Sequence, residues 1–153
     1  GKNEKGQGRR EKGEGSKEKG EEEKELPKIL LVEDDLASRI LTERYLKELC
    51  DIDYASNGEI ALQMANNYQY PAIIMDINLG KGLSGLDVTE QIRNLEQYER
   101  TPIIAMTAYA MKGDREEFLE LMDGKSKGCS YYISKPYDKE DIYEIVDKIL
   151  KNP

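Results

Sequence analysis

Four short apolar runs in this chain each end on side chains that can take part in phosphate chemistry. The runs cover residues 29–32, 71–75, 102–106 and 131–134. They lead into Glu33 and Asp34, into Asp76, into Thr107 and into Lys135, in that order. Parallel strands end at a common edge of a sheet, and the ligand sites of open α/β sheets form at that edge. We therefore expect these five side chains to form one site.

Strand and helix patterns alternate from residue 28 onward. Continuous apolar runs are typical of strands that are covered on both faces, whereas apolar residues at helical spacing separate the runs. We expect strands over 29–32, 52–55, 72–75, 103–106 and 132–133. We expect helices over 36–49, 59–67, 88–95 and 114–122, and a last helix that Asp138 caps. Five such units predict an α/β doubly wound parallel sheet with helices on both faces.

The first 25 residues differ in composition from the rest of the chain. They contain equal numbers of basic and acidic residues and none of the apolar residue types. Because such a segment buries nothing, it cannot offset the entropy cost of becoming ordered. We interpret residues 1–26 as a charged flexible linker from a longer protein, and residues 27–153 as one globular domain.

Charge and cysteine usage exclude several classes of function. The globular part carries the whole formal charge of −8, which argues against binding to nucleic acid or to an anionic membrane surface. No apolar stretch approaches the roughly 20 residues that cross a bilayer. Cys50 and Cys129 form no C-x-x-C pair and histidine is absent, so we expect reduced thiols, no structural zinc and a cytoplasmic location.

The acidic residues predict a cation site if the first and third strands are neighbours. Glu33, Asp34 and Asp76 would then converge, and like charges that close are unfavourable without a cation. Oxygen ligands without His or Cys favour Mg²⁺, with Mn²⁺ as the alternative. Lys135 adds a positive charge for a phosphoryl oxygen, and Thr107 adds a hydroxyl. Asp76 stands alone at its strand end, so it is the best candidate for a nucleophile that forms an aspartyl phosphate.

Residues 28–151 resemble the receiver domain of two-component response regulators. The matching segments are ILLVEDD at 29–35, IMDI at 74–77, MTA at 106–108 and YISKP at 132–136. The run MKGDREE at 111–117 is similar to receivers attached to hybrid sensor histidine kinases. The resemblance implies a flavodoxin-like (βα)5 fold with strand order 2-1-3-4-5.

The resemblance also implies a role for each residue of the expected site. Asp76 corresponds to the phosphoacceptor, Asp34 to the direct Mg²⁺ ligand, and Glu33 to the acid that reaches the metal through water. Thr107 corresponds to the hydroxyl that moves toward the phosphoryl group, and Lys135 to the lysine that pairs with this group.

Further positions and the partners are implied in the same way. Tyr132 corresponds to the aromatic residue that repositions on activation, and Asn78 to the residue whose backbone carbonyl binds the metal. Asn78 and Tyr109 correspond to positions whose side chains set how fast the phosphoryl group is lost. In this family the receiver domain itself catalyses that loss. The implied partner is a histidine kinase or a histidine phosphotransfer domain. The surface that switches is formed by the fourth helix, fifth strand and fifth helix, and a weak homodimer through it is also compatible with the family.

The sequence departs from the family pattern at three places, and two of them leave alternatives open. Asp35 is either a third acid near the site or the N-cap of the next helix. The segment 122–127 looks like an insertion, which either alters partner choice and self-association or is a tolerated surface loop. Gly80 and Gly82 should make the loop after Asp76 more mobile.

The resemblance leaves two questions of function open. The domain is either the C-terminal receiver of a hybrid sensor histidine kinase or a stand-alone response regulator. A receiver that is never phosphorylated is less well supported, because the acids, Thr107 and Lys135 are all present. A phosphatase of the haloacid-dehalogenase kind would need a second acid at the position of Asn78.

Overall fold

The computed structural model describes residues 25–80, 82–108 and 129–152. Five parallel strands form one sheet in the order β2-β1-β3-β4-β5, which confirms the flavodoxin-like order. The strands are β1 (Lys28–Val32), β2 (Asp51–Ala55), β3 (Ile73–Asp76), β4 (Ile103–Thr107) and β5 (Tyr131–Ser134).

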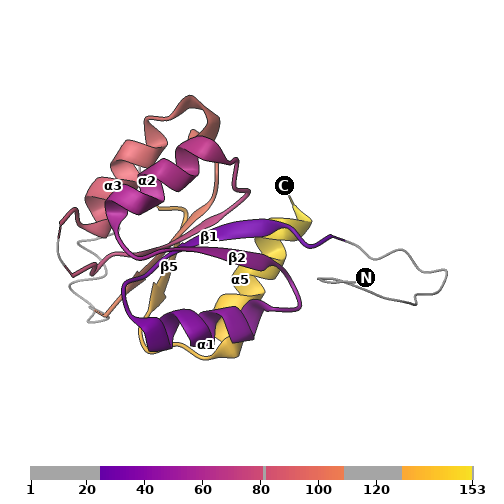
Figure 1. The fold of residues 1–153 in the computed structure, drawn as a ribbon. Coiled ribbons are helices and arrows are strands. Elements are labelled where there is room, and N and C mark those ends of the chain that lie inside the picture. Colours follow the sequence, from indigo (N-terminus) through magenta and orange to yellow (C-terminus); the bar gives the residue numbers. More distant parts are fainter. Residues whose placement is uncertain (1–24, 81, 109–128, 153) are drawn as a thin grey trace, which may run out of the picture.

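Helices cover both faces of this sheet. The described helices are α1 (Leu36–Leu46), α2 (Gly58–Asn67), α3 (Gly85–Arg93), the 3-10 helix η1 (Glu96–Tyr98) and α5 (Lys139–Lys151). Helices α2 and α3 lie side by side on one face, and α1 packs against α5 on the other (Figure 1). None of these described helices combines the length and the apolar character that a membrane-spanning helix needs. The helix expected over 114–122 lies outside the described residues.

The strand residues alternate between two hydrophobic cores. In β1, Leu30 and Val32 face the core under α2 and α3, whereas Ile29 and Leu31 face the core under α1 and α5. All four side chains are fully buried. Burial on both faces is the reason why each strand reads as a continuous apolar run in the sequence.

The ends of the described helices test three expectations from the sequence, namely the caps at Asp35 and Asp138 and the end of the first helix. Asp35 is the N-cap of α1, because its carboxylate accepts a hydrogen bond of 2.8 Å from the Ser38 N–H. Asp138 caps α5 in a reciprocal capping box with Asp141. Helix α1 is shorter than predicted, since it ends at Leu46, whose carbonyl accepts hydrogen bonds from the two backbone N–H groups at 49 and 50.

Candidate functional site

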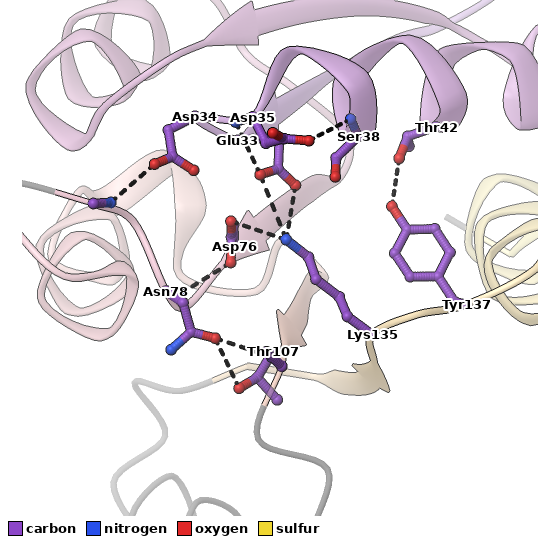
Figure 2. A network of polar contacts seen from close by, with 12 residues as sticks. Glu33, Asp34, Asp35, Ser38, Thr42, Asp76, Asn78, Thr107, Lys135 and Tyr137 are labelled. Carbon is purple, nitrogen blue, oxygen red and sulfur yellow. Dashed lines mark hydrogen bonds and ion pairs between the residues drawn. The ribbon is translucent and has the colours of Figure 1, made fainter.

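The predicted site residues meet at the carboxyl edge of the sheet. Glu33 directly follows β1, Asp76 ends β3, Thr107 ends β4 and Lys135 follows β5 (Figure 2). The register of the strands brings these ends level, because Asp76 pairs with the residue before Thr107 and Thr107 pairs with the last residue of β5. The sheet therefore assembles the four strand ends that the sequence pattern singled out.

The Lys135 amine connects two buried carboxylates. Its Nζ atom lies 3.1 Å from Glu33 Oε1 and 3.1 Å from Asp76 Oδ2. The side chains of Glu33 and Asp76 are 1% and 2% exposed, so both carboxylates are shielded from water. Burial acts to lower the pKa of Lys135, but attraction by Asp76 and Glu33 outweighs it and raises this pKa. The amine is therefore held in its charged form.

Glu33 is the side chain whose ionisation the site disturbs most clearly. Burial, a hydrogen bond with Asp76 and repulsion by the Asp76 charge raise the pKa of Glu33 to about 7, although Lys135 opposes the rise. Its Oε2 atom also accepts a hydrogen bond of 3.2 Å from the Asp35 N–H. Below neutral pH this carboxyl therefore keeps a proton that an ordinary glutamate has already lost.

Three carboxylates at this edge suit a divalent cation. Ligand oxygens of Glu33, Asp34 and Asp76 all lie within 4.8 Å of one another. Lys135 contributes one positive charge, so the four side chains keep a net negative charge when the acids are ionised. Oxygen donors of this kind are the ligands that hard cations such as Mg²⁺ select. The chemistry of the site therefore fits the predicted magnesium ion.

Asn78 links the Asp76 carboxylate to the end of β4. Its backbone N–H donates a hydrogen bond of 2.9 Å to Asp76 Oδ1. Its side-chain oxygen Oδ1 accepts hydrogen bonds from the Thr107 hydroxyl at 3.1 Å and from the Ala108 N–H at 3.0 Å (Figure 2). The family resemblance assigned Asn78 a backbone carbonyl for the metal and a part in tuning the loss of the phosphoryl group, but it did not predict these side-chain contacts.

Two glycines allow the backbone to approach the acids. The Gly80 N–H donates a hydrogen bond of 3.1 Å to Asp34 Oδ2. At Gly85, a Cβ atom would lie 2.3 Å from the carbonyl oxygen of Asp76 and 2.6 Å from the Cα atom of Ile77. The first turn of α3 thus packs directly on the backbone that carries Asp76, and the sequence pattern did not identify Gly85 as part of the site. The sequence feature that could have pointed to Gly85 is its place directly after Ser84, the N-cap of α3.

The remaining predicted positions have different outcomes. Tyr132 lies on β5, opposite Ala105 of β4, and is half-buried. Tyr109 and the segment 122–127 lie outside the described residues. The roles assigned to individual side chains stay predictions, although their positions agree with those roles.

Comparison with known proteins assigns this chain to a family. The family model described as the response regulator receiver domain matches residues 29–147. The chain belongs to this family. It is therefore a receiver domain of two-component signal transduction, as the motifs at the strand ends indicated. Receiver domains in general bind Mg²⁺ in an acidic pocket and interact with histidine kinases or phosphotransfer proteins.

Individual relatives come from several kinds of protein. The chain is 38% identical to hybrid signal transduction histidine kinase I of Dictyostelium discoideum, over 78% of this chain and 7% of the kinase. It is 32% identical to the polar-differentiation response regulator DivK of Brucella anthropi, over 82% of this chain and 98% of DivK. The chain thus spans a small part of some relatives and nearly all of others.

The receiver fold is also found among solved structures. The receiver domain of a sensor histidine kinase from Pseudomonas aeruginosa, solved with a magnesium ion coordinated in its active site cleft, has a TM-score of 0.71 and 33% identity. The match covers 83% of this chain and 99% of that domain. The magnesium ion is a property of that protein, and its relevance to this receiver is argued below.

Proposed function

We propose that this receiver domain accepts a phosphoryl group on Asp76 from the phosphohistidine of a histidine kinase or a histidine phosphotransfer domain. The observation that carries the proposal is the contact of the Lys135 amine with Asp76 inside a cluster of three acids. Of the two strand-end acids that contact Lys135, Asp76 stands alone at the end of its strand, whereas Glu33 is followed directly by Asp34 and Asp35. The domain acts in the cytoplasm, where such kinases present their phosphohistidine.

The transfer is a substitution at phosphorus. A carboxylate oxygen of Asp76 attacks the phosphorus atom, the O–P bond forms, and the P–N bond to the donor imidazole breaks. The imidazole leaves with the electron pair of that bond. The Lys135 amine, held beside the attacking carboxylate, donates hydrogen bonds to the phosphoryl oxygens as negative charge gathers on them. Water later attacks the same phosphorus atom, the O–P bond to Asp76 breaks, and inorganic phosphate leaves the free carboxylate.

The acids of the site would hold the cation that this chemistry uses. Asp34 and Asp76 are the ligands we propose for Mg²⁺, with the Asn78 backbone carbonyl beside them and Glu33 acting through water. When bound, Mg²⁺ offsets the charge of the carboxylates and of the phosphoryl oxygens. Mn²⁺ has the same ligand preference and is expected to substitute for it.

Phosphorylation is expected to switch the domain between two arrangements. The phosphoryl group draws the Thr107 hydroxyl toward it, and Tyr132 on the neighbouring strand follows. This change alters the surface that includes β5 and α5, which receives the downstream partner or a second copy of the domain. Asn78 and Tyr109 are expected to tune how long the phosphoryl group persists.

A direct experiment measures the intact mass after incubation with acetyl phosphate and Mg²⁺. The wild-type protein should gain one phosphoryl group, whereas Asp76→Asn should gain none and chelation of Mg²⁺ should prevent the gain. A wild-type protein that binds Mg²⁺ but never gains mass would instead be a receiver that only binds partners. Glu99→Gln, at an exposed position at the opposite end of the sheet, is the matched control.

We also propose that the domain belongs to a hybrid sensor histidine kinase. The identities of 38% and 35% to two hybrid signal transduction histidine kinases support this origin. The alternative is a stand-alone response regulator, which the near-complete coverage of DivK favours. An immunoblot of the native cells with an antibody against this domain distinguishes them. A band several times larger than the 17.5 kDa of this chain supports the hybrid kinase, and a band near that mass supports the regulator.

A further inference from the structure

Asn78 joins two parts of the site, namely the Asp76 carboxylate and the end of β4. Its Oδ1 atom accepts one hydrogen bond from the Thr107 hydroxyl and a second from the Ala108 N–H. The backbone N–H of Asn78 is bound to Asp76 Oδ1, which anchors this residue to the acceptor carboxylate. The carboxamide therefore occupies a defined place between Asp76 and the end of β4.

From these contacts we propose that the Asn78 carboxamide is a latch that holds Thr107 and Ala108 in the unphosphorylated arrangement. The latch sets how readily the domain enters the phosphorylated arrangement. This inference rests on the proposed phosphoacceptor function, because it concerns the regulation of the same site.

The latch follows from the number of protons on a hydroxyl group. A threonine hydroxyl has one proton to donate, so Thr107 cannot donate to the Asn78 carboxamide and to a phosphoryl oxygen at the same time. Thr107 is only 4% exposed, so water is poorly placed to replace the carboxamide when the bond breaks. The move of Thr107 toward a phosphoryl group therefore includes the cost of releasing Asn78.

The second contact extends the latch into the backbone. Ala108 follows the last residue of β4, and its N–H is held by the same oxygen atom as the Thr107 hydroxyl. Release of Asn78 thus frees one side chain and one backbone group together. Because a ligand shifts an equilibrium only through its different affinities for two states, a weaker latch should raise the affinity for any phosphoryl-like ligand.

The experiment uses four proteins: wild type, Asn78→Ala, Thr107→Val and the double variant. Asn78→Ala keeps the backbone groups of residue 78, so the N–H that binds Asp76 is retained. Asn66→Ala is the control, since Asn66 is an exposed asparagine on α2 whose amide contacts a backbone carbonyl of its own helix. Two quantities are measured, namely amide hydrogen exchange at Ala108 without metal and the affinity for beryllium trifluoride with Mg²⁺.

The latch predicts a specific pattern across these proteins. In Asn78→Ala, exchange at Ala108 should accelerate by roughly fivefold and the affinity for beryllium trifluoride should rise roughly two- to tenfold, as for the loss of one hydrogen bond. In the Thr107→Val background the same Asn78 substitution should leave this affinity unchanged. The Asn66 control should match wild type in both measurements.

Other outcomes overturn the inference, and they separate it from the proposed function. Unchanged exchange at Ala108 together with normal ligand binding would overturn the latch and leave the phosphoacceptor function standing. An equal gain in affinity with and without the Thr107 hydroxyl would also overturn it. Failure of wild type to bind beryllium trifluoride would overturn the phosphoacceptor function itself.

Discussion

The Lys135 Nζ atom lies 3.1 Å from Asp76 Oδ2, although 59 residues separate the two in the chain. The same amine lies 3.1 Å from Glu33 Oε1. One positive charge thus holds two buried acids together before any phosphoryl group or cation arrives. The acids of the site are suited to bind a cation, and the Lys135 amine is suited to bind an anionic group.

Replacement of Lys135 tests this double role. Lys135→Met should destabilise the metal-free domain by about 2 kcal/mol, because two buried carboxylates lose a charged hydrogen-bond donor. Phosphorylation by acetyl phosphate should slow by about a hundredfold, as when one donor to a developing oxyanion is removed. Urea unfolding and intact-mass time courses measure the two effects.

A matched lysine serves as the control for this variant. Lys151 pairs with Asp147 on the surface of α5, and its side chain is 72% exposed. Lys151→Met should change stability by less than about 0.5 kcal/mol and leave phosphorylation unchanged. Equal losses in both lysine variants would contradict the special role of Lys135.

Glu33 should make the stability of the metal-free domain depend on pH. Its pKa is about 7 in the folded protein, against 4.5 ordinarily, so the native state keeps a proton that the unfolded chain has already lost. Between these two values the native state binds more protons, and the free energy of unfolding falls as the pH rises. Glu33→Gln should lack this loss and gain at least about 1.4 kcal/mol over wild type between about pH 5 and about pH 8.

Urea unfolding at both pH values without metal provides the measurement. Glu59→Gln, an exposed position on α2, should follow wild type at each pH. If the Glu33 variant lost stability in parallel with wild type, another group would be responsible for the pH dependence.

Gly85 should resist substitution because backbone atoms occupy the space beside it. In Gly85→Ala the new methyl group would meet the Asp76 carbonyl oxygen at 2.3 Å, so the first turn of α3 or the end of β3 has to shift. We expect a loss of about 2 to 3 kcal/mol in stability and slower phosphorylation, since the Asp76 carboxylate moves with its backbone. Thermal unfolding and intact-mass time courses measure both.

Gly82→Ala is the comparison for this prediction. Gly82 has a φ of +86°, but among the described residues no atom other than those of Gly82 and its chain neighbours lies within 4 Å of the place that a Cβ atom would take. Only the backbone conformation therefore opposes a side chain there. The cost should be about 1 kcal/mol, with phosphorylation retained. A larger effect at Gly82 than at Gly85 would contradict the packing argument.

Arg93 is expected to stabilise the end of the sheet opposite the site. Its buried guanidinium donates hydrogen bonds to the carbonyls of Tyr98 at 2.7 Å and Thr101 at 2.6 Å, and to Ser130 Oγ at 3.3 Å. Arg93→Met should cost about 3 kcal/mol, because these acceptors lose a charged donor. Phosphorylation should persist at temperatures where the variant is folded, whereas exposed Arg100→Met should behave as wild type in both respects.

Much of the fold was predictable from residues 28 to 107 because burial there follows a local period. The apolar runs ending at Val32 and Met75 marked strands covered on both faces, and both strands were confirmed. The predicted end of the first helix was wrong, because Leu49 continues the apolar stripe although the backbone already turns at Leu46. The second helix begins at Gly58, one residue before its predicted start, because Asn57 caps α2 through a hydrogen bond from the Ile60 N–H.

The sequence by itself determined which strand ends carry acids, a hydroxyl and an amine, since the alternation of apolar and polar segments is local information. Only the tertiary structure decided that Lys135 contacts both Glu33 and Asp76, and that Asn78 holds Thr107. It also decided that Gly85 touches the backbone of Asp76. These contacts depend on strand order, register and side-chain direction, which are set by packing between segments far apart in the chain and leave no periodic trace in the sequence.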